Sequence, residues 1–169
     1  MAPNLSVSST INLCAILMLA MFSFTTARET KLSSLFIQND PATRTVVAGP
    51  RDFRFGTIAV ADDKITAGRS RFSREIARIQ GANITSSLDG QKAVIEASII
   101  FTRGKYNGST LEVQGVASAS AKVREYAVTG GTGEFRFAVG YATFENVVRK
   151  AQYSVDRLDI TVRFVENLS

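Results

Sequence analysis

Short segments in which apolar and polar residues alternate with a period of two recur along most of this chain. The clearest covers residues 93–102, where alanine, isoleucine or phenylalanine occupies every second position. Glycines and Asp-Gly or Asn-Gly pairs separate the segments, and Asp89-Gly90 directly precedes this one. Such pairs favour hairpin turns, and over long windows a period of two fits better than a helical period does. The pattern therefore predicts an all-β protein.

The alternating segments predict about eight strands joined as an antiparallel meander. They cover residues 32–38, 53–61, 72–80 continuing into 84–88, 93–102, 110–116, 135–143 and 153–165, whereas residues 41–50 are expected to form a loop. A meander of this kind folds as a sandwich or closes as a barrel. The segments are apolar on one face and only partly polar on the other, which favours a barrel whose exterior is partly covered by partner subunits. Such a barrel has room for one small ligand.

The segment after the glycines at 130–133 is predicted to be a long strand that follows a tight turn. Alternation would place Phe135, Phe137, Val139, Tyr141 and Thr143 on one face of this strand, and the small Ala138, Gly140 and Ala142 on the other. The glycines are not followed by the Lys-Ser/Thr pair of a phosphate-binding loop, so we expect no such site here.

The first 27 residues have the pattern of a secretory signal peptide. An apolar run at 11–22 is followed by small and polar residues, and the first charged side chain is Arg28. The run is too short for a membrane helix, although an apolar helix kept in the mature domain is an alternative. We therefore expect cleavage after Ala27 and one domain over 28–169. Secretion would make Asn83 and Asn107, each in an N-x-S/T triplet, sites of glycosylation.

The composition excludes several classes of chemistry. The chain has no histidine, and its one cysteine, Cys14, lies in the predicted signal peptide. Serine or cysteine nucleophiles activated by histidine and metal sites built from nitrogen and sulfur ligands are therefore not expected, and neither is any cofactor. Proton transfer by aspartate and glutamate remains. The net charge of +5 suits an acidic polysaccharide, while no nucleic-acid motif and no membrane segment is recognised in the mature part.

Carboxylates at the predicted strand ends are the candidates for this chemistry. Asp40 follows the first strand, Asp62 and Asp63 follow the second, and Glu134 follows the glycine turn. A carboxyl group at the mouth of an apolar barrel would have a raised pKa and would serve as a general acid. Each of these residues also fits an ordinary turn or surface charge.

Several motifs occur in a fixed order and together resemble the plant dirigent family. They are F-G-T-I-A-V-A-D-D-K-I-T-A-G (55–68), R-I-Q-G (78–81), S-S-L-D-G (86–90), F-T-R-G-K-Y-N-G-S-T-L (101–111) and V-R-E-Y-A-V-T-G-G-T-G-E-F-R-F-A-V-G-Y-A (123–142). The resemblance implies an eight-stranded antiparallel up-and-down β-barrel. It also implies a glycoprotein that is secreted to the apoplast and forms a homo-oligomer, either a dimer or a trimer.

The resemblance implies a function in which another protein supplies the oxidation. A dirigent protein directs the stereoselective coupling of phenoxy radicals from a phenolic such as coniferyl alcohol into an optically active lignan, and a separate oxidase or laccase makes the radicals. The first alternative is a dirigent-type dehydratase or cyclase that acts on a quinone-methide precursor such as an isoflavanol. The second is a non-catalytic, wall-associated defence protein.

The resemblance also implies a set of site residues. Asp40, Asp63 and Glu134 are expected to be catalytic, and Arg78, Tyr106, Phe137, Val139 and Tyr141 to bind the substrate. Val139 departs from the family pattern, which has arginine in that place, so a charged pocket residue would be missing. Arg136 is not a simple replacement, because the odd separation puts it on the opposite strand face. If this set is right, Asp40, Asp63 and Glu134 converge on one apolar cavity.

Overall fold

The computed structural model describes residues 27–150 and 152–165, so residues 1–26 of the predicted signal peptide lie outside the described part. The strands are β1 (Ala27–Asn39), β2 (Arg44–Ala48), β3 (Ile58–Thr66), β4 (Glu75–Thr85), β5 (Lys92–Phe101), β6 (Thr110–Ser118), β7 (Val123–Thr132), β8 (Val139–Arg149) and β9 (Ser154–Val165). Single 3₁₀ turns occur at η1 (Pro41–Thr43), η2 (Gly104–Tyr106) and η3 (Gly133–Phe135). None of these helical turns has the length and apolar character that crossing a membrane requires.

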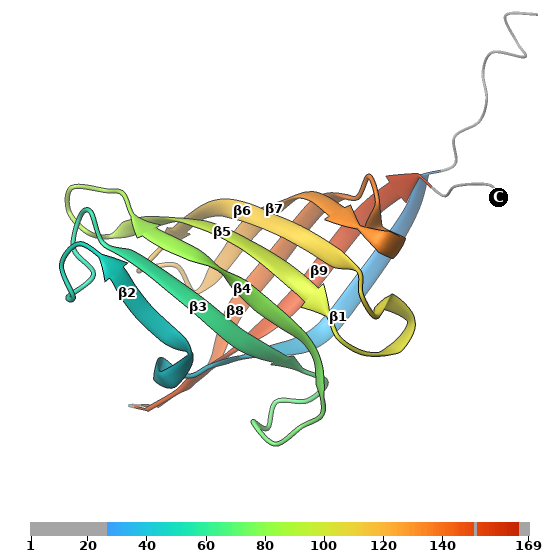
Figure 1. Ribbon diagram of the computed structural model, residues 1–169, viewed down its shortest axis with the longest axis horizontal. Coiled ribbons are helices and arrows are strands. Elements are labelled where there is room, and N and C mark those ends of the chain that lie inside the picture. The colour runs from blue at the N-terminus through green and yellow to red at the C-terminus, as the bar shows by residue number, and fades with distance from the viewer. Residues whose placement is uncertain (1–26, 151, 166–169) are drawn as a thin grey trace, which may run out of the picture. The chain divides into compact units, whose positions relative to one another are not determined.

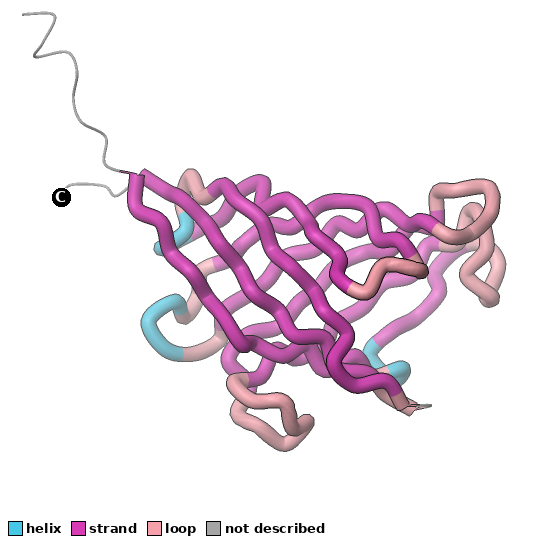
Figure 2. Tube along the Cα trace, turned by 180° about the vertical axis from the view of Figure 1, so that it is seen from behind, coloured by secondary structure: helices cyan, strands magenta, loops and turns pink. Residues whose placement is uncertain are grey.

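Eight of the strands close into an antiparallel up-and-down barrel (Figures 1 and 2), which confirms the predicted fold class. Each strand from β3 to β9 pairs with the next, and β9 pairs with β1. The ring is closed where β1 pairs with β3, with Ile37 opposite Ile65 at the centre of the contact. β2 lies outside the ring and pairs with the first half of β3, where Thr45 faces Val60. Closure removes the exposed edges that an open sheet would have.

The barrel is hollow at one end and solid at the other because the sizes of its inward-facing side chains differ. We call the end where β1 finishes and β9 begins the mouth, and the opposite end the closed end. The inner wall near the mouth has small residues at Ala59, Ala61, Gly81, Ala97 and Ala117. The closed half is filled by large, fully buried residues, among them Ile65, Ile99, Leu111, Leu158, Ile160 and Val162.

Three aromatic rings seal the closed end. Phe135 from η3 is fully buried and packs against Tyr106 from η2, with the ring centroids 4.7 Å apart. The ring centroid of Phe101, at the end of β5, lies 5.2 Å from that of Phe135 and 5.7 Å from that of Tyr106. Aromatic pairs at these separations stabilise a core beyond the area that they bury. The turns η2 and η3 therefore act as a hydrophobic plug.

Several segments differ from the sequence-based expectation. Residues 44–48 form β2 within the predicted loop, and β7 is a strand that the pattern did not predict, because charged side chains interrupt its apolar residues. β3 covers Ile58–Thr66 in place of the predicted 53–61, so Asp62 and Asp63 lie within this strand and not after it. Gly130 and Gly131 belong to the end of β7, and Gly133 begins η3. η3 also breaks the predicted strand at 135–143, since β8 begins only at Val139 and Phe137 has a positive φ of 63°.

This break separates Phe135 from the other residues of its predicted face, whereas the two faces predicted for residues 137–142 remain distinct. Phe135 is buried, whereas Phe137, Val139 and Tyr141 point outward and are 66%, 57% and 45% exposed. The inward positions belong instead to the small residues Ala138 and Ala142, both of which are fully buried. The prediction that the aromatic row of this strand lines the barrel is therefore wrong.

The close approach of β8 to β9 predicts the effect of one substitution. A Cβ atom on Gly140 would overlap the carbonyl oxygen of Thr161, so Gly140→Ala forces the two backbones apart. We expect the free energy of unfolding to fall by about 1–3 kcal/mol, as in other overpacked cores. Thermal or urea unfolding measures the change.

The matched control is Gly130→Ala in β7, where no heavy atom lies within 4 Å of the added Cβ. This variant should keep the stability of the parent within about 0.5 kcal/mol. Equal loss of stability in both variants would contradict the described contact between β8 and β9.

Candidate functional site

A cavity opens at the mouth and narrows into the barrel. Its outer part has a volume of about 810 Å³ and lies between η1, β2 and the loops at the ends of β6 and β8. Its inner part adds about 130 Å³ and receives residues from every strand of the ring. Asn39, Arg44, Arg124 and Asp156 line both parts, so the two form one continuous funnel. The size fits a drug-sized ligand.

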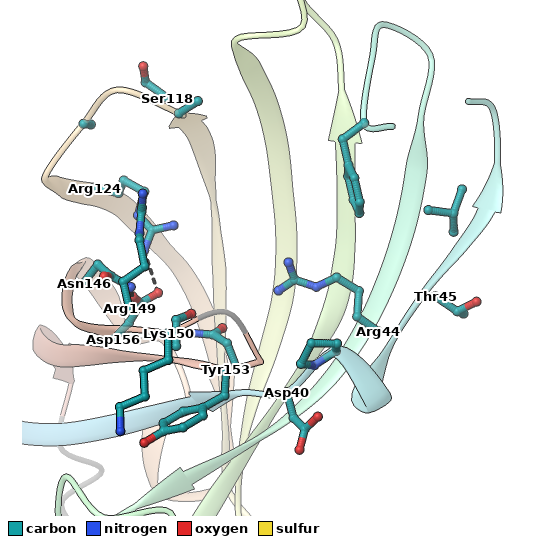
Figure 3. A pocket seen from close by; sticks show the side chains of 17 residues that line it. Asp40, Arg44, Thr45, Ser118, Arg124, Asn146, Arg149, Lys150, Tyr153 and Asp156 are labelled. Atoms are coloured by element: carbon teal, nitrogen blue, oxygen red, sulfur yellow. Dashed lines mark hydrogen bonds and ion pairs between the residues drawn. The ribbon is translucent and has the colours of Figure 1, made fainter. Parts of the chain in front are cut away.

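Charged side chains stand on two facing walls of the mouth (Figure 3). Arg44 on β2 extends from one wall toward the other, where Arg124, Asn146 and Asp156 lie together. Arg149 and Lys150, at the end of β8, complete this second wall beside Tyr153. The walls below are mainly apolar, with Ile37, Ile79, Ile95 and Phe144 among the lining residues.

Asp63 is the buried carboxyl group of the inner cavity. It occupies an inward position of β3 and is only 3% exposed. Its Oδ1 accepts hydrogen bonds from the Thr43 hydroxyl and from the backbone N–H of Asp40, and its Oδ2 lies 3.8 Å from Arg44. Burial raises the pKa of Asp63, because desolvation of the charged form outweighs these hydrogen bonds and the nearby arginine. Asp63 is therefore suited to carry a proton.

Asp40 lies beside Asp63 but plays a different structural part. Its carboxylate caps η1 by accepting the backbone N–H of Ala42 at 3.0 Å, and it forms an ion pair with Arg71 at 3.5 Å. The Thr43 hydroxyl oxygen also lies 2.7 Å from the Asp40 carbonyl oxygen, so its one proton is within reach of both Asp63 and this carbonyl. Asp40 thus fixes the turn that presents hydrogen-bond donors to Asp63.

An ion pair that is largely buried supports the opposite wall. Asp156 is 4% exposed and accepts hydrogen bonds from Arg124 at 2.6 Å and from the Asn146 amide at 2.8 Å. A buried charge is tolerated when it is paired and hydrogen-bonded in this way. The contacts join β7, β8 and β9 and hold the Arg124 guanidinium at the rim of the inner cavity.

Tyr126 and Asn83 are neutral polar residues of the inner wall whose side chains have no hydrogen-bond partner among the described residues, and Asn39 at the end of β1 is a third. Tyr126 is 3% exposed and packs edge-on against Phe144, with the ring centroids 4.8 Å apart. Burial raises the pKa of its hydroxyl. Neither this hydroxyl nor the Asn83 side chain forms a hydrogen bond with any residue that the structure describes. Both are available to a hydroxylated ligand.

The predicted catalytic residues do not all meet. Asp40 and Asp63 lie together at the mouth, as expected, but Glu134 lies in η3 at the closed end and is exposed. The register explains this, because β7 starts at the mouth with Val123 opposite Glu145 and carries the chain to the other end before η3. Glu134 is therefore removed from the candidate site.

The predicted substrate-binding residues lie outside the cavity. Arg78 is on the outer face of β4, where it pairs with Asp62 at 2.7 Å and holds the pKa of that carboxyl below its usual value. Tyr106 belongs to the aromatic plug. Phe137, Val139 and Tyr141 point outward. An arginine in place of Val139 would therefore add no charge to this cavity.

The two predicted glycosylation sites differ in position. Asn83 lies two residues before the end of β4 and lines the inner cavity. Its glycosylation stays a prediction, and a glycan at this position would have to occupy the cavity. Asn107 is exposed in the turn after η2, and its position is compatible with a glycan.

Three functional residues were missed by the sequence reasoning, namely Arg44, Arg124 and Asp156. Asp156 precedes Leu158, Ile160 and Val162 at the same spacing of two, so the alternation already placed it inward. Arg124 lies two residues before the inward Tyr126 in β7, a strand that the sequence pattern did not predict. An arginine and an aspartate at inward positions were the signal for a polar rim.

Comparison with known proteins places this fold and site among relatives. The family model described as dirigent-like protein matches residues 35–163. Dirigent protein 21 of Arabidopsis thaliana is 36% identical over 118 residues, which make up 70% of this chain and 60% of that relative. Pterocarpan synthase 1 of Glycine max is 40% identical over 89 residues, or 52% of this chain and 48% of the relative. The aligned part of the chain thus spans about half to three fifths of these relatives.

A solved structure described as the pterocarpan synthase dirigent protein superposes with a TM-score of 0.77 and covers 98% of both chains at 26% identity. The match extends over the barrel that bears the mouth and the inner cavity. The resemblance drawn from the ordered motifs is confirmed: this chain belongs to the dirigent family.

Proposed function

We propose that this chain is a dirigent-type cyclase that binds a phenolic substrate in the funnel and promotes ring closure through a quinone methide. The observation that carries the proposal is the protonatable Asp63, buried in the wall of a cavity that is closed at its far end. General acid catalysis requires such a group with its pKa raised toward the working pH. The similarity to proteins named pterocarpan synthases supports the same choice.

The proposed reaction is a loss of water followed by an internal addition. Asp63 donates its proton to a hydroxyl on a benzylic carbon, the carbon–oxygen bond breaks, and water leaves. The phenol of the same molecule loses its proton to solvent and becomes the carbonyl of the quinone methide, while Asp63 regains a proton from solvent. A second hydroxyl adds to the methide carbon, and its proton restores the phenol. One water is lost and no oxidant is needed.

The funnel would contribute orientation as well as acid catalysis. The apolar lower wall excludes water from the methide, which water would otherwise trap. The free Tyr126 hydroxyl and Asn83 amide would hydrogen-bond the substrate's oxygens and select one face for the attack. The product would therefore be formed as one stereoisomer.

Stereoselective coupling of two phenoxy radicals is the second candidate. The outer cavity of about 810 Å³ favours it, because this volume lies near the upper end of the range for ligand sites and accommodates two small phenolics. A separate oxidase or laccase would supply the radicals, and the product would be a lignan. Asp63 would then assist the closure of the coupled intermediate.

We further propose that the protein is secreted to the apoplast, glycosylated at Asn107 and self-associated. The apolar run at 11–22 supports secretion. The outward row of Phe137, Val139 and Tyr141 supports self-association, since exposed apolar side chains gathered on one strand are typical of contact surfaces. If the protein changes neither the yield nor the stereochemistry of any product, a wall-associated defence role without catalysis is the remaining candidate.

Turnover without oxidant distinguishes the two candidates. We expect purified protein to convert an isoflavanol into a product lighter by one water, with one enantiomer in excess, in the absence of any oxidase. Chiral chromatography with mass spectrometry measures the product. If the isoflavanol is unchanged while coniferyl alcohol plus an oxidase gives an optically active dimer only with the protein, radical coupling is the function.

Asp63→Asn should lower the rate of product formation by roughly 100- to 10,000-fold, since an amide cannot donate the proton. The Asn side chain still accepts the hydrogen bonds from Thr43 and Asp40, so the fold should persist. Asp62→Asn is the matched control, because the neighbouring carboxylate lies on the outer face with Arg78. Equal activity of the parent and Asp63→Asn would rule out Asp63 as the acid.

The raised pKa of Asp63 also predicts how activity and stability depend on pH. Its protonated form is favoured in the folded protein, so turnover should fall as the pH rises through this pKa. Above it the folded state carries an unfavourable buried charge, which Asp63→Asn lacks. The variant should thus unfold at an equal or higher temperature than the parent at pH 7, and this advantage should vanish below about pH 3.9, where both side chains are neutral.

We expect a glycan on Asn107 and none on Asn83. In a secretory plant host, Asn107→Gln should remove a glycan and reduce the mass of the product, whereas Asn83→Gln should leave the glycan mass unchanged. Mass spectrometry before and after enzymatic deglycosylation checks both. A glycan found on Asn83 would contradict its described position inside the barrel.

A further inference from the structure

Positive charge exceeds negative charge around the mouth. Three carboxylates face this region, and each has a cationic neighbour: Asp156 lies 2.6 Å from Arg124, Asp40 lies 3.5 Å from Arg71, and Asp63 lies 3.8 Å from Arg44. Arg149 and Lys150 also line the outer cavity, but neither forms an ion pair with any residue that the structure describes. Two cations of the rim are therefore left without a carboxylate.

The unmatched cations stand where a ligand would leave the barrel. Figure 3 shows Arg149 on the wall that also carries Arg124 and Asp156, with Lys150 beside Tyr153 at the lower rim. The Lys150 ammonium lies 5.4 Å from the centre of the Tyr153 ring. Arg44 reaches in from the opposite wall, and Arg124 also lines the mouth but is paired with Asp156.

The charge at the mouth and the apolar character of the interior fix one orientation for an amphiphilic ligand. An aromatic ring gains by entering among Ile37, Ile79, Ile95 and Phe144, whereas a charged group pays a large desolvation penalty there. At the mouth the same group keeps part of its hydration and meets the guanidinium of Arg149. Arginine binds carboxylates through two parallel hydrogen bonds, which gives this contact direction as well as attraction.

We propose that the mouth binds an anionic group, and that the substrate is a phenolic that bears a carboxylate in addition to the two hydroxyls that the proposed ring closure requires. This inference rests on the proposed function, since it assumes that a phenolic enters the funnel. The inference adds a class of substrate to the proposed function. It also assigns substrate specificity to Arg149, which has no part in the acid chemistry of Asp63. Long-range attraction to the basic mouth would also speed the arrival of such a substrate.

A pair of ligands that differ only in the charged group tests the proposal by isothermal titration calorimetry. Ferulate and coniferyl alcohol share the same ring and side-chain length, and end in a carboxylate and an alcohol respectively. We expect ferulate to bind on the order of 5- to 10-fold more tightly at low salt. High salt should reduce this advantage, because it screens charges at a solvent-exposed mouth.

Arg149→Gln should weaken the binding of ferulate several-fold and leave that of coniferyl alcohol unchanged. The matched control is Arg103→Gln, which removes an exposed arginine next to η2 at the closed end. Equal affinity of the two ligands for the parent protein would overturn the proposal, as would equal losses in the two variants. Binding of coniferyl alcohol alone would overturn it and leave the proposed function standing, whereas binding of neither phenolic would contradict both.

Discussion

Closure of the sheet between β1 and β3 is the constraint on which the remaining features of this protein depend. The pairing of residues 36–38 with residues 64–66 joins the first strand of the ring to the second and closes the eight strands into a ring. Once the ring is closed, every second residue of each strand is committed to a narrow interior. The sizes of these residues alone then decide which part of the barrel is filled and which part is hollow. Small residues near the mouth create the funnel, and the large buried residues of the closed half end it.

The enclosed interior also sets the electrostatic character of the site. Asp156 has a strong partner in Arg124 at 2.6 Å, whereas Asp63 has only a distant arginine and two neutral donors. The same burial therefore has opposite consequences for the two carboxyl groups. One serves as a fixed anion that holds an arginine in place, and the other retains its proton more readily than a free aspartate would. Of the two inward aspartates, Asp63 can therefore act as a general acid in a chain that has no histidine.

Much of the fold was predictable because the period of two is a direct consequence of strand geometry. The ordered motifs added the barrel topology. The site was less predictable, since alternation assigns a face only where the limits of the strand are right. The 3₁₀ turn η3 delays the start of β8 to Val139 and buries Phe135, while Phe137, Val139 and Tyr141 lie on the outer face. Glu134 was misplaced for a different reason, because closeness to a glycine motif says nothing about which end of the barrel a turn occupies.

The sequence pattern predicted Asp40 and Asp63 at two strand ends, but Asp63 lies within β3, and the pairing of β1 with β3 brings the two together. Arg44 was not predictable, since β2 lacks the strong alternation of the barrel strands and three of its five residues line the outer cavity. Asp156 and Arg124, in contrast, could have been found by extending the inward positions of their strands by two residues. A charged residue at an inward position of an apolar strand face therefore indicates a residue of the cavity wall.

β2 pairs with β3 alone and lies outside the closed ring, yet it supplies one wall of the mouth through Arg44. Substitutions in this short segment disturb a single strand pairing and leave the eight-stranded ring intact. The outline of the mouth can therefore change through substitutions in β2 without opening the ring beneath it.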